Sequence, residues 1–257
     1  MSNKNLSADD KKNGEMTRQV KSKQRVADHG EVFTAEREVN AMLDLVKHET
    51  ERVDSRFLEP ACGDGNFLAE ILRRKLEVAK KAAIPPKKKR PLPVAFEKQA
   101  VIAIASIYGV DLMMDNVLAC RERLYGIWNK EYESICKKEI SEDCRNAVRF
   151  ILRKNIVCGN ALSLKVVDEQ GKDTEEPIVF SEWSFVMGDR MQRKDFRFDK
   201  LLAGEYEPKP GGKGRKVGKD EDNQQMALFS NLEEPSEEGE FIKSYIADYR
   251  RIQEYGE

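Results

Sequence analysis

Residues 57–68, Phe-Leu-Glu-Pro-Ala-Cys-Gly-Asp-Gly-Asn-Phe-Leu, constrain the fold more than any other stretch of the chain. An apolar strand end is followed by an acidic turn with two glycines, Gly63 and Gly65. A helix follows, and its apolar positions recur on one face: Leu68, Ile71, Leu72 and Leu76. The order strand, glycine turn and helix predicts the ligand-binding corner of an α/β fold, where glycine lets a ligand approach the main chain.

The residues around the two glycines narrow the class of ligand. A dinucleotide site or a P-loop needs further glycines or a Gly-Lys-Ser/Thr ending beside the helix N-terminus, and this segment has neither. Glu59 and Asp64 place carboxylates on both sides of the turn instead. The segment therefore favours a cationic or hydroxyl-rich ligand over a pyrophosphate.

The run from Leu58 to Leu68 resembles the cofactor motif of S-adenosylmethionine-dependent adenine-N6 DNA methyltransferases of restriction-modification systems. The resemblance extends over about residues 28–164. It implies that the turn passes under the methionine and adenosine of S-adenosylmethionine. The cofactor-binding residues implied within this motif are Glu59, Ala61, Gly63, Gly65 and Phe67.

A second motif of the same family precedes the first. Residues 30–34, Gly-Glu-Val-Phe-Thr, stand before a helix predicted from the spacing of Val39, Met42, Leu43 and Val46. Thr34 suits the N-cap of that helix. The resemblance implies that Phe33 and Thr34 hold the methionine end of the cofactor.

Asp111 is the best single candidate for a ligand-binding residue. A helix predicted over 95–106 leads into a short strand, 107–111, that ends in this carboxylate. One carboxylate there can accept hydrogen bonds from both hydroxyls of a ribose. Gly-Val-Asp before a helix also matches the family, which implies that Leu112 contacts the cofactor as well.

A third strand is predicted over 155–162, after a helix at 139–153. In the family, the turn after this strand commonly carries an acidic residue that accepts from the adenine amino group of the cofactor. Asn160 occupies that position, and its amide oxygen can still accept a hydrogen bond. Asn160 and Ala161 therefore complete the implied cofactor site.

The catalytic motif of the family is degenerate in this chain. Family enzymes end the next strand with Asn or Asp, two prolines and an aromatic residue that stacks on a flipped base. After a hairpin or fourth strand over 164–187, Asp189 could supply the acceptor, but Arg190, Met191 and Gln192 replace the remaining residues. Asp189 is the catalytic candidate. Two interpretations follow: the chain is a methyltransferase subunit that needs a partner's catalytic loop, or it is an adaptor subunit without chemistry. As substrates, RNA or protein glutamine are a weaker alternative to DNA.

We expect three regions along the chain. Residues 1–27 form a polar and basic arm, residues 28–203 the S-adenosylmethionine-binding domain, and residues 204–257 a disordered, low-complexity tail with a short terminal helix. The expected fold is a Rossmann-like class I methyltransferase sheet, truncated after its fourth strand, with an N-terminal helix. Such truncation leaves the central strand with an open edge that a companion subunit can pair with.

Charge and short motifs suggest further partners. The net charge is −1, so DNA binding requires locally clustered cations. Residues 17–25 and Lys87–Arg90 are two such clusters. The alternative for each is a solvated segment that binds nothing. Residues 225–229, Gln-Met-Ala-Leu-Phe, are similar to the peptide that bacterial sliding-clamp binders carry, with docking onto this domain or a partner as the alternative.

Several classes of protein are disfavoured by composition. The five cysteines are scattered without a Cys-x-x-Cys pair, and the chain has two histidines, so neither a metal site nor a disulfide framework is expected. No apolar run approaches membrane-spanning length. The expectation is a cytoplasmic protein that does not bind membranes.

Overall fold

The computed structural model describes residues 21, 23–29, 34–203 and 242–255, and the chain divides into two units, 1–46 and 47–257. The first unit contains helices α2 (Lys23–His29) and α3 (Glu36–Leu45). Ala35 is the N-cap of α3, so the prediction of Thr34 in that position is wrong by one residue. Phe33 and the segment 225–229 lie outside the described residues.

The second unit is built on a five-stranded mixed sheet in the order β1-β2-β3-β4-β5. The strands are β1 (Phe57–Glu59), β2 (Ile107–Asp111), β3 (Ile156–Asn160), β4 (Lys165–Val167) and β5 (Asp173–Pro177). The first three are parallel, as predicted, and β4 and β5 add to them in antiparallel pairing. The chain is therefore an α/β protein in which β1 forms one end of the sheet.

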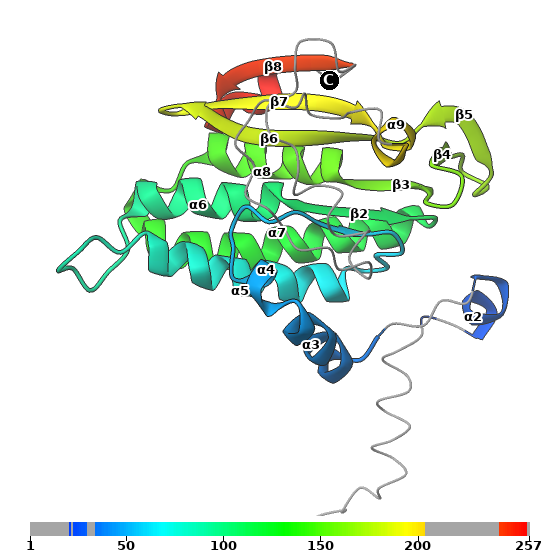
Figure 1. Ribbon diagram of the computed structural model, residues 1–257, viewed down its shortest axis with the longest axis horizontal. Helices are drawn as coiled ribbons and strands as arrows, with labels where there is room; N and C mark the ends of the chain where they lie inside the picture. The colour runs from blue at the N-terminus through cyan, green and yellow to red at the C-terminus, as the bar shows by residue number, and fades with distance from the viewer. Residues whose placement is uncertain (1–20, 22, 30–33, 204–241, 256–257) are drawn as a thin grey trace, which may run out of the picture. The chain divides into compact units, whose positions relative to one another are not determined.

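Helices either pack on one face of this sheet or run end to end into its strands (Figure 1). They are α4 (Lys47–Thr50), α5 (Asn66–Ala82), α6 (Pro93–Ala105), α7 (Met114–Cys136), η1 (Lys137–Glu139) and α8 (Glu142–Asn155). Helices α5 and α7 lie below the parallel strands in Figure 1, while α6 and α8 run directly into β2 and β3. Pro93 starts α6, and the Ser141 hydroxyl caps α8 by accepting from the amide of Cys144.

A second, antiparallel sheet of three strands covers the opposite face (Figure 1). Its strands are β6 (Val179–Met187), β7 (Arg190–Arg197) and β8 (Lys243–Asp248), accompanied by α9 (Phe198–Leu202) and η3 (Tyr249–Glu254). The ring of Phe180 meets that of Tyr108 edge-on at 5.5 Å and that of Phe198 at 5.2 Å. This apolar layer buries the side chains of Tyr108, Val110, Ile178, Phe180, Phe198 and Leu201.

The second sheet corrects two predictions. Residues 178–187 do not extend the parallel sheet as a fourth strand, because a tight turn at Gly188, with φ of 60°, folds β6 back onto β7. The predicted terminal helix is present only in part, since residues 243–248 pair with β7 as a strand and the helical residues are 249–254, which form the 3-10 helix η3. Ala247 and Tyr249 are buried and alternate with exposed residues, which is the pattern of a strand.

A buried carboxylate ties the C-terminal segment to the helices. Glu97 of α6 is 1% exposed and accepts hydrogen bonds from the hydroxyls of Tyr132 and Tyr249 and from Nε of Arg250. The guanidinium supplies the opposite charge that a buried carboxylate requires. Residues 243–254 are therefore part of the folded unit. The prediction of a disordered tail over 204–257 is wrong for these residues.

Lys75 is a buried amine beneath the start of β1. Its Nζ donates to the carbonyls of Val53 and Ser55 and to the hydroxyl of Ser106. Burial away from water lowers the pKa of Lys75 to about 7, although the nearby carboxylates of Asp54 and Glu49 act in the opposite direction. This side chain fixes the segment that leads into β1.

The depressed pKa of Lys75 predicts a pH dependence of stability. Between pH 7 and 10.5 the unfolded chain binds a proton that the folded chain has released, so rising pH favours the folded state. Chemical denaturation should show that the unfolding free energy of the parent, minus that of Lys75→Met, rises by about 3 kcal/mol between pH 7 and 9.5. The exposed control Lys81→Met should show no such rise, and a constant difference for Lys75→Met would contradict the assignment.

Candidate functional site

The candidate site is the turn between β1 and α5. Gly63 and Gly65 both adopt left-handed backbone angles, with φ of 52° and 89°. The turn is closed by the amide of Gly65, which donates to the carbonyl of Cys62 at 2.8 Å. The amide of Cys62 donates to the carbonyl of Val110 at 2.9 Å, which fastens the turn to β2. The main chain at this corner is therefore fixed at the carboxyl ends of the parallel strands.

Close packing adds to the requirement for glycine at two positions. A Cβ at Gly65 would lie 2.7 Å from Sγ of Cys120 on α7. A Cβ at Gly109 on β2 would lie 3.0 Å from Sγ of Cys62. The two thiols are buried against the turn, and a hydrogen bond to Cys120 together with burial raises the pKa of Cys62. Cys62 and Cys120 therefore serve as packing groups rather than nucleophiles.

Asp111 joins the glycine turn to the turn after β2. Its carboxylate accepts from the amide of Gly63 at 2.9 Å, from the amide of Met113 at 2.8 Å, and from Nδ2 of Asn116 at 3.1 Å. Asp111 is partly exposed, and a carboxylate has about four acceptor positions. The fixed carboxylate thus retains capacity to accept from one further donor, such as a hydroxyl.

The two acidic residues that flank the turn differ in what they contact. Asp64 is bound by both terminal nitrogens of Arg123 on α7, at 2.7 and 3.2 Å, so its charge is neutralised within the fold. Glu59, at the end of β1, pairs with no cation among the described residues, and burial raises its pKa while a hydrogen bond from the amide of Ala61 lowers it. Glu59 is therefore the flanking acid that remains for a ligand.

Asn160 forms a turn of its own at the end of β3. Its amide oxygen accepts from the amide of Leu162 at 3.0 Å, and its Nδ2 donates to Asp173 at 3.0 Å. The oxygen that was expected to receive an adenine amino group thus has one acceptor position occupied within the turn and one remaining. Ala161, by contrast, packs on the apolar layer between the sheets.

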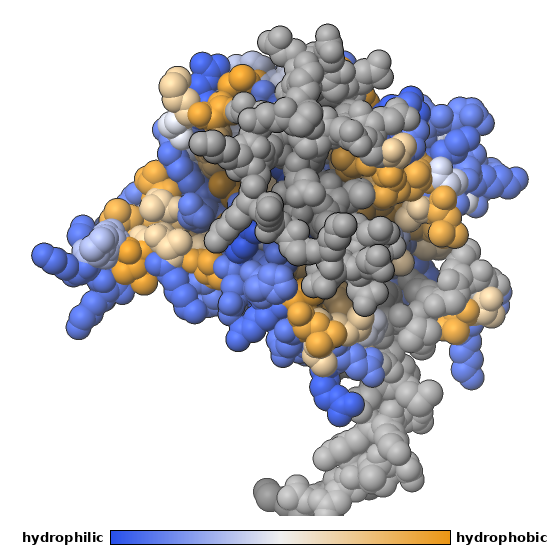
Figure 2. Space-filling model, in the orientation of Figure 1, coloured by the Kyte–Doolittle hydropathy of each residue, from blue (hydrophilic) through white to orange (hydrophobic). Residues whose placement is uncertain are grey.

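Exposed apolar side chains lie beside these polar groups. Leu112 is 41% exposed and directly follows β2, and Leu162 is 96% exposed and lies two residues after the end of β3. Figure 2 shows apolar residues gathered around the carboxyl ends of β2 and β3. A ligand with a planar apolar part could cover this surface while its hydroxyls reach Asp111.

The fold brings some of the predicted residues together and separates others. Glu59, Ala61, Gly63, Gly65 and Phe67 share one turn and helix start, and Asp111 and Leu112 adjoin it. Thr34 belongs to the other unit of the chain and Phe33 is outside the described residues. Sequence reasoning missed the two side chains that hold the acidic residues in place, Asn116 and Arg123.

Asp189 is at the opposite end of the sheet. Along β6, the carbonyl of Ser181 accepts from Tyr108, and Trp183 donates to Asn155, the residue before β3. Strand β6 therefore runs toward the amino ends of the parallel strands, away from the glycine turn (Figure 1). Asp189 lies in the turn beyond it, where an ion pair with Lys98 lowers its pKa. The structure does not bring the predicted catalytic residue to the candidate site.

Two other features are absent from the part of the chain that the structure describes. No cluster of three or more His, Cys, Asp or Glu side chains could hold a metal ion there. None of the described helices combines the length and the apolar character needed to cross a membrane. Comparisons with protein-family models, curated proteins and solved structures found no match to this chain.

The packing of Gly65 predicts a position-specific loss of stability. Gly65→Ala should lower the unfolding free energy by about 2 kcal/mol or more, because it combines a left-handed residue with a clash against Cys120. The matched control is Gly126→Ala on α7, where a Cβ meets nothing within 4 Å. That change should raise the unfolding free energy by about 0.5–1 kcal/mol, since it replaces glycine within a helix. Equal effects in urea denaturation would contradict the packing argument.

Proposed function

We propose that this chain binds S-adenosylmethionine at the glycine turn and acts as the cofactor-binding subunit of an adenine-N6 DNA methyltransferase. The observation that carries the proposal is the hydrogen bond from the amide of Gly63 to the carboxylate of Asp111. It sets a glycine turn and a strand-end carboxylate side by side at the carboxyl edge of a parallel sheet. Ligands of open α/β sheets bind at such an edge, so the described topology supports a Rossmann-like assignment.

The residues at the turn fit the chemistry of the cofactor. Asp111 would accept from the ribose hydroxyls, and Glu59 would face the cationic sulfonium or amino group. The missing side chains of Gly63 and Gly65 leave the main chain open to the methionine part. Leu112 and Leu162 would contact the faces of the adenine ring. When bound, the cofactor supplies an electrophilic methyl group; the residues of this chain hold and orient it.

The position of Asp189 supports the need for a companion chain. An acceptor for the target amino group has to lie within hydrogen-bond reach of that group near the sulfonium methyl, and Asp189 is paired with Lys98 at the other end. Among the described residues, no strand pairs with the outer edge of β1. Since the amide of Phe57 donates to Ser106 on the β2 side, the main-chain groups of Leu58 face outward. A strand of a companion subunit would add there and bring its catalytic loop beside Glu59.

The same position of Asp189 also favours a second function, an adaptor subunit that binds the cofactor and a partner without performing chemistry. In that case cofactor binding would control assembly rather than methyl transfer. Both functions require the site at Asp111, and they differ in whether the assembled complex transfers a methyl group to DNA.

Cofactor binding tests the shared part of the proposal. Asp111→Asn keeps the size of the side chain but removes its charge and one acceptor oxygen, so the Kd for S-adenosylmethionine should rise about 10- to 100-fold. Titration calorimetry on the full chain measures this value. Asp248→Asn is the control, because that carboxylate caps η3 by accepting from the amide of Arg250 at 2.9 Å and is remote from the turn. No heat of binding with the parent chain would refute the proposal.

Methyl transfer separates the two functions. With tritiated S-adenosylmethionine and duplex DNA, the purified chain alone should give no incorporation above background. Addition of the products of adjacent genes should produce tritium in N6-methyladenine. Incorporation by the chain alone would contradict the need for a companion subunit, and failure with every partner that binds the chain would favour the adaptor.

A further inference from the structure

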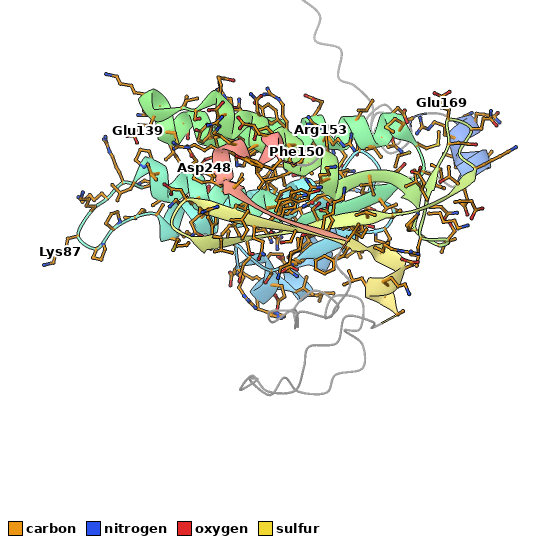
Figure 3. All side chains as sticks on the ribbon, turned by 90° about the horizontal axis from the view of Figure 1, so that it is seen from above. Lys87, Glu139, Phe150, Arg153, Glu169 and Asp248 are labelled. Carbon is orange, nitrogen blue, oxygen red and sulfur yellow. The ribbon has the colours of Figure 1, made fainter. Side chains whose placement is uncertain are left out.

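The loop between α5 and α6 presents four consecutive cations at its tip, Lys87, Lys88, Lys89 and Arg90, which we call the basic loop. Its base is closed by the amide of Leu92, which donates to the carbonyl of Ala83 at 2.9 Å. A turn within it is closed by the amide of Lys88, which donates to Pro85 at 3.0 Å. The loop projects from the body of the second unit, with Lys87 at its outer end (Figures 1 and 3).

The cations of the basic loop have no carboxylate partner within the described part of the chain, unlike several cations on the helices. All four are exposed, and within the described residues they form no ion pair or side-chain hydrogen bond. On α5, by contrast, Arg73 and Arg74 both bind the carboxylate of Glu70, at 3.4 and 3.1 Å. The charge of the basic loop is therefore available to an external anion.

Neighbouring segments extend the same positive region. Cys136 at the end of α7 donates from Sγ to the carbonyl of Pro93 at 3.6 Å, which sets η1 beside the base of the loop. Lys137 and Lys138 of η1 are exposed, as is Lys81 in the last turn of α5. The carboxylates in this region are Glu77, Glu131 and Glu139; Lys80 lies within 4 Å of the first two, and Glu139 follows Lys138 directly.

We propose that the basic loop binds the phosphate backbone of duplex DNA, which deepens the proposed function by assigning the DNA contact to a surface of this chain. Clustered lysines and arginines gain free energy by releasing the counterions of DNA. The segment 85–91 consists of prolines and cations. It has no aromatic side chain to stack on a base and no apolar side chain to enter a membrane. Its prolines restrict the free loop and so reduce the entropy lost on binding.

The place of the loop defines its role. Helix α5 has 17 residues and runs from the glycine turn to the loop, so the two ends are separated by about 25 Å. Duplex DNA that reached both would extend over about seven base pairs. The basic loop would therefore position the duplex through its backbone, while sequence reading and base flipping take place elsewhere.

A salt series tests the assignment. The full chain and a variant with Lys87, Lys88, Lys89 and Arg90 replaced by Gln are titrated against a labelled duplex of about 30 base pairs, with fluorescence anisotropy as the readout. The slope of log K against log salt should become smaller by up to about 3.6 in the variant, since each lost phosphate contact removes about 0.9. At about 0.1 M salt the Kd should rise at least tenfold.

The matched control removes four cations that have partners. Lys47, Arg52, Arg73 and Arg251 each lie within 4 Å of a carboxylate, and their replacement by Gln gives the same change in net charge. This variant should keep the parent slope. An unchanged slope in the loop variant, or an equal loss in both variants, would overturn the proposal. So would loss of binding to phosphatidylserine vesicles with DNA affinity unchanged.

Cofactor calorimetry on the same variants keeps this proposal distinct from the proposed function. Uptake of S-adenosylmethionine by the loop variant should equal that of the parent, because the loop is remote from Asp111. If the parent takes up cofactor and the loop variant keeps the parent's salt slope, the proposal that the basic loop binds DNA is refuted and the proposed function stands. A reduced salt slope without any cofactor uptake by the parent would refute the proposed function and leave the DNA contact standing.

Discussion

The hydrogen bond between the amide of Gly63 and the carboxylate of Asp111 holds the candidate site together. It connects two turns that follow different parallel strands, and it can form only because the glycine turn exposes a main-chain amide there. Gly65 lets the same turn approach Cys120 on α7, and Arg123 neutralises Asp64 beside it. The local structure therefore orients the carboxylate of Asp111 against the main chain of the glycine turn, with Glu59 beside it.

The position of the second sheet explains why Asp189 is absent from the candidate site. The turn at Gly188 folds β6 onto β7, and the aromatic contacts of Phe180 hold β6 across the face of the parallel strands. A strand in that position runs away from the glycine turn and cannot also extend the edge of β1. Burial of Glu97 with Tyr249 and Arg250 then fastens the C-terminal strand in the same layer. The same packing that stabilises the fold thus places Asp189 away from the glycine turn.

Sequence predicted the features that depend on local residue order. The strand, turn and helix at 57–82 and the strand ending at Asp111 follow from spacing and glycine placement, and both are present. The pairing of β8 with β7 was not predictable in this way, because it joins residues separated by a long polar segment. Asn160 shows another limit. Its place at the end of β3 was predicted, but its hydrogen bond to Asp173 depends on how β5 is placed in the sheet.

Charge is distributed unevenly along the second unit, although the whole chain has a net charge of −1. Glu59 and Asp111 lie at the glycine-turn end of α5, and the four cations of the basic loop, which form no ion pair within the described residues, lie at its other end. An acidic end suits a cationic cofactor and repels the backbone of DNA at long range, whereas the basic loop attracts it. A DNA substrate would then be held by its backbone at one end, and only a base that leaves the duplex would approach the carboxylates. The separation of the two charges is therefore consistent with a subunit that holds cofactor and DNA but depends on another chain to join them.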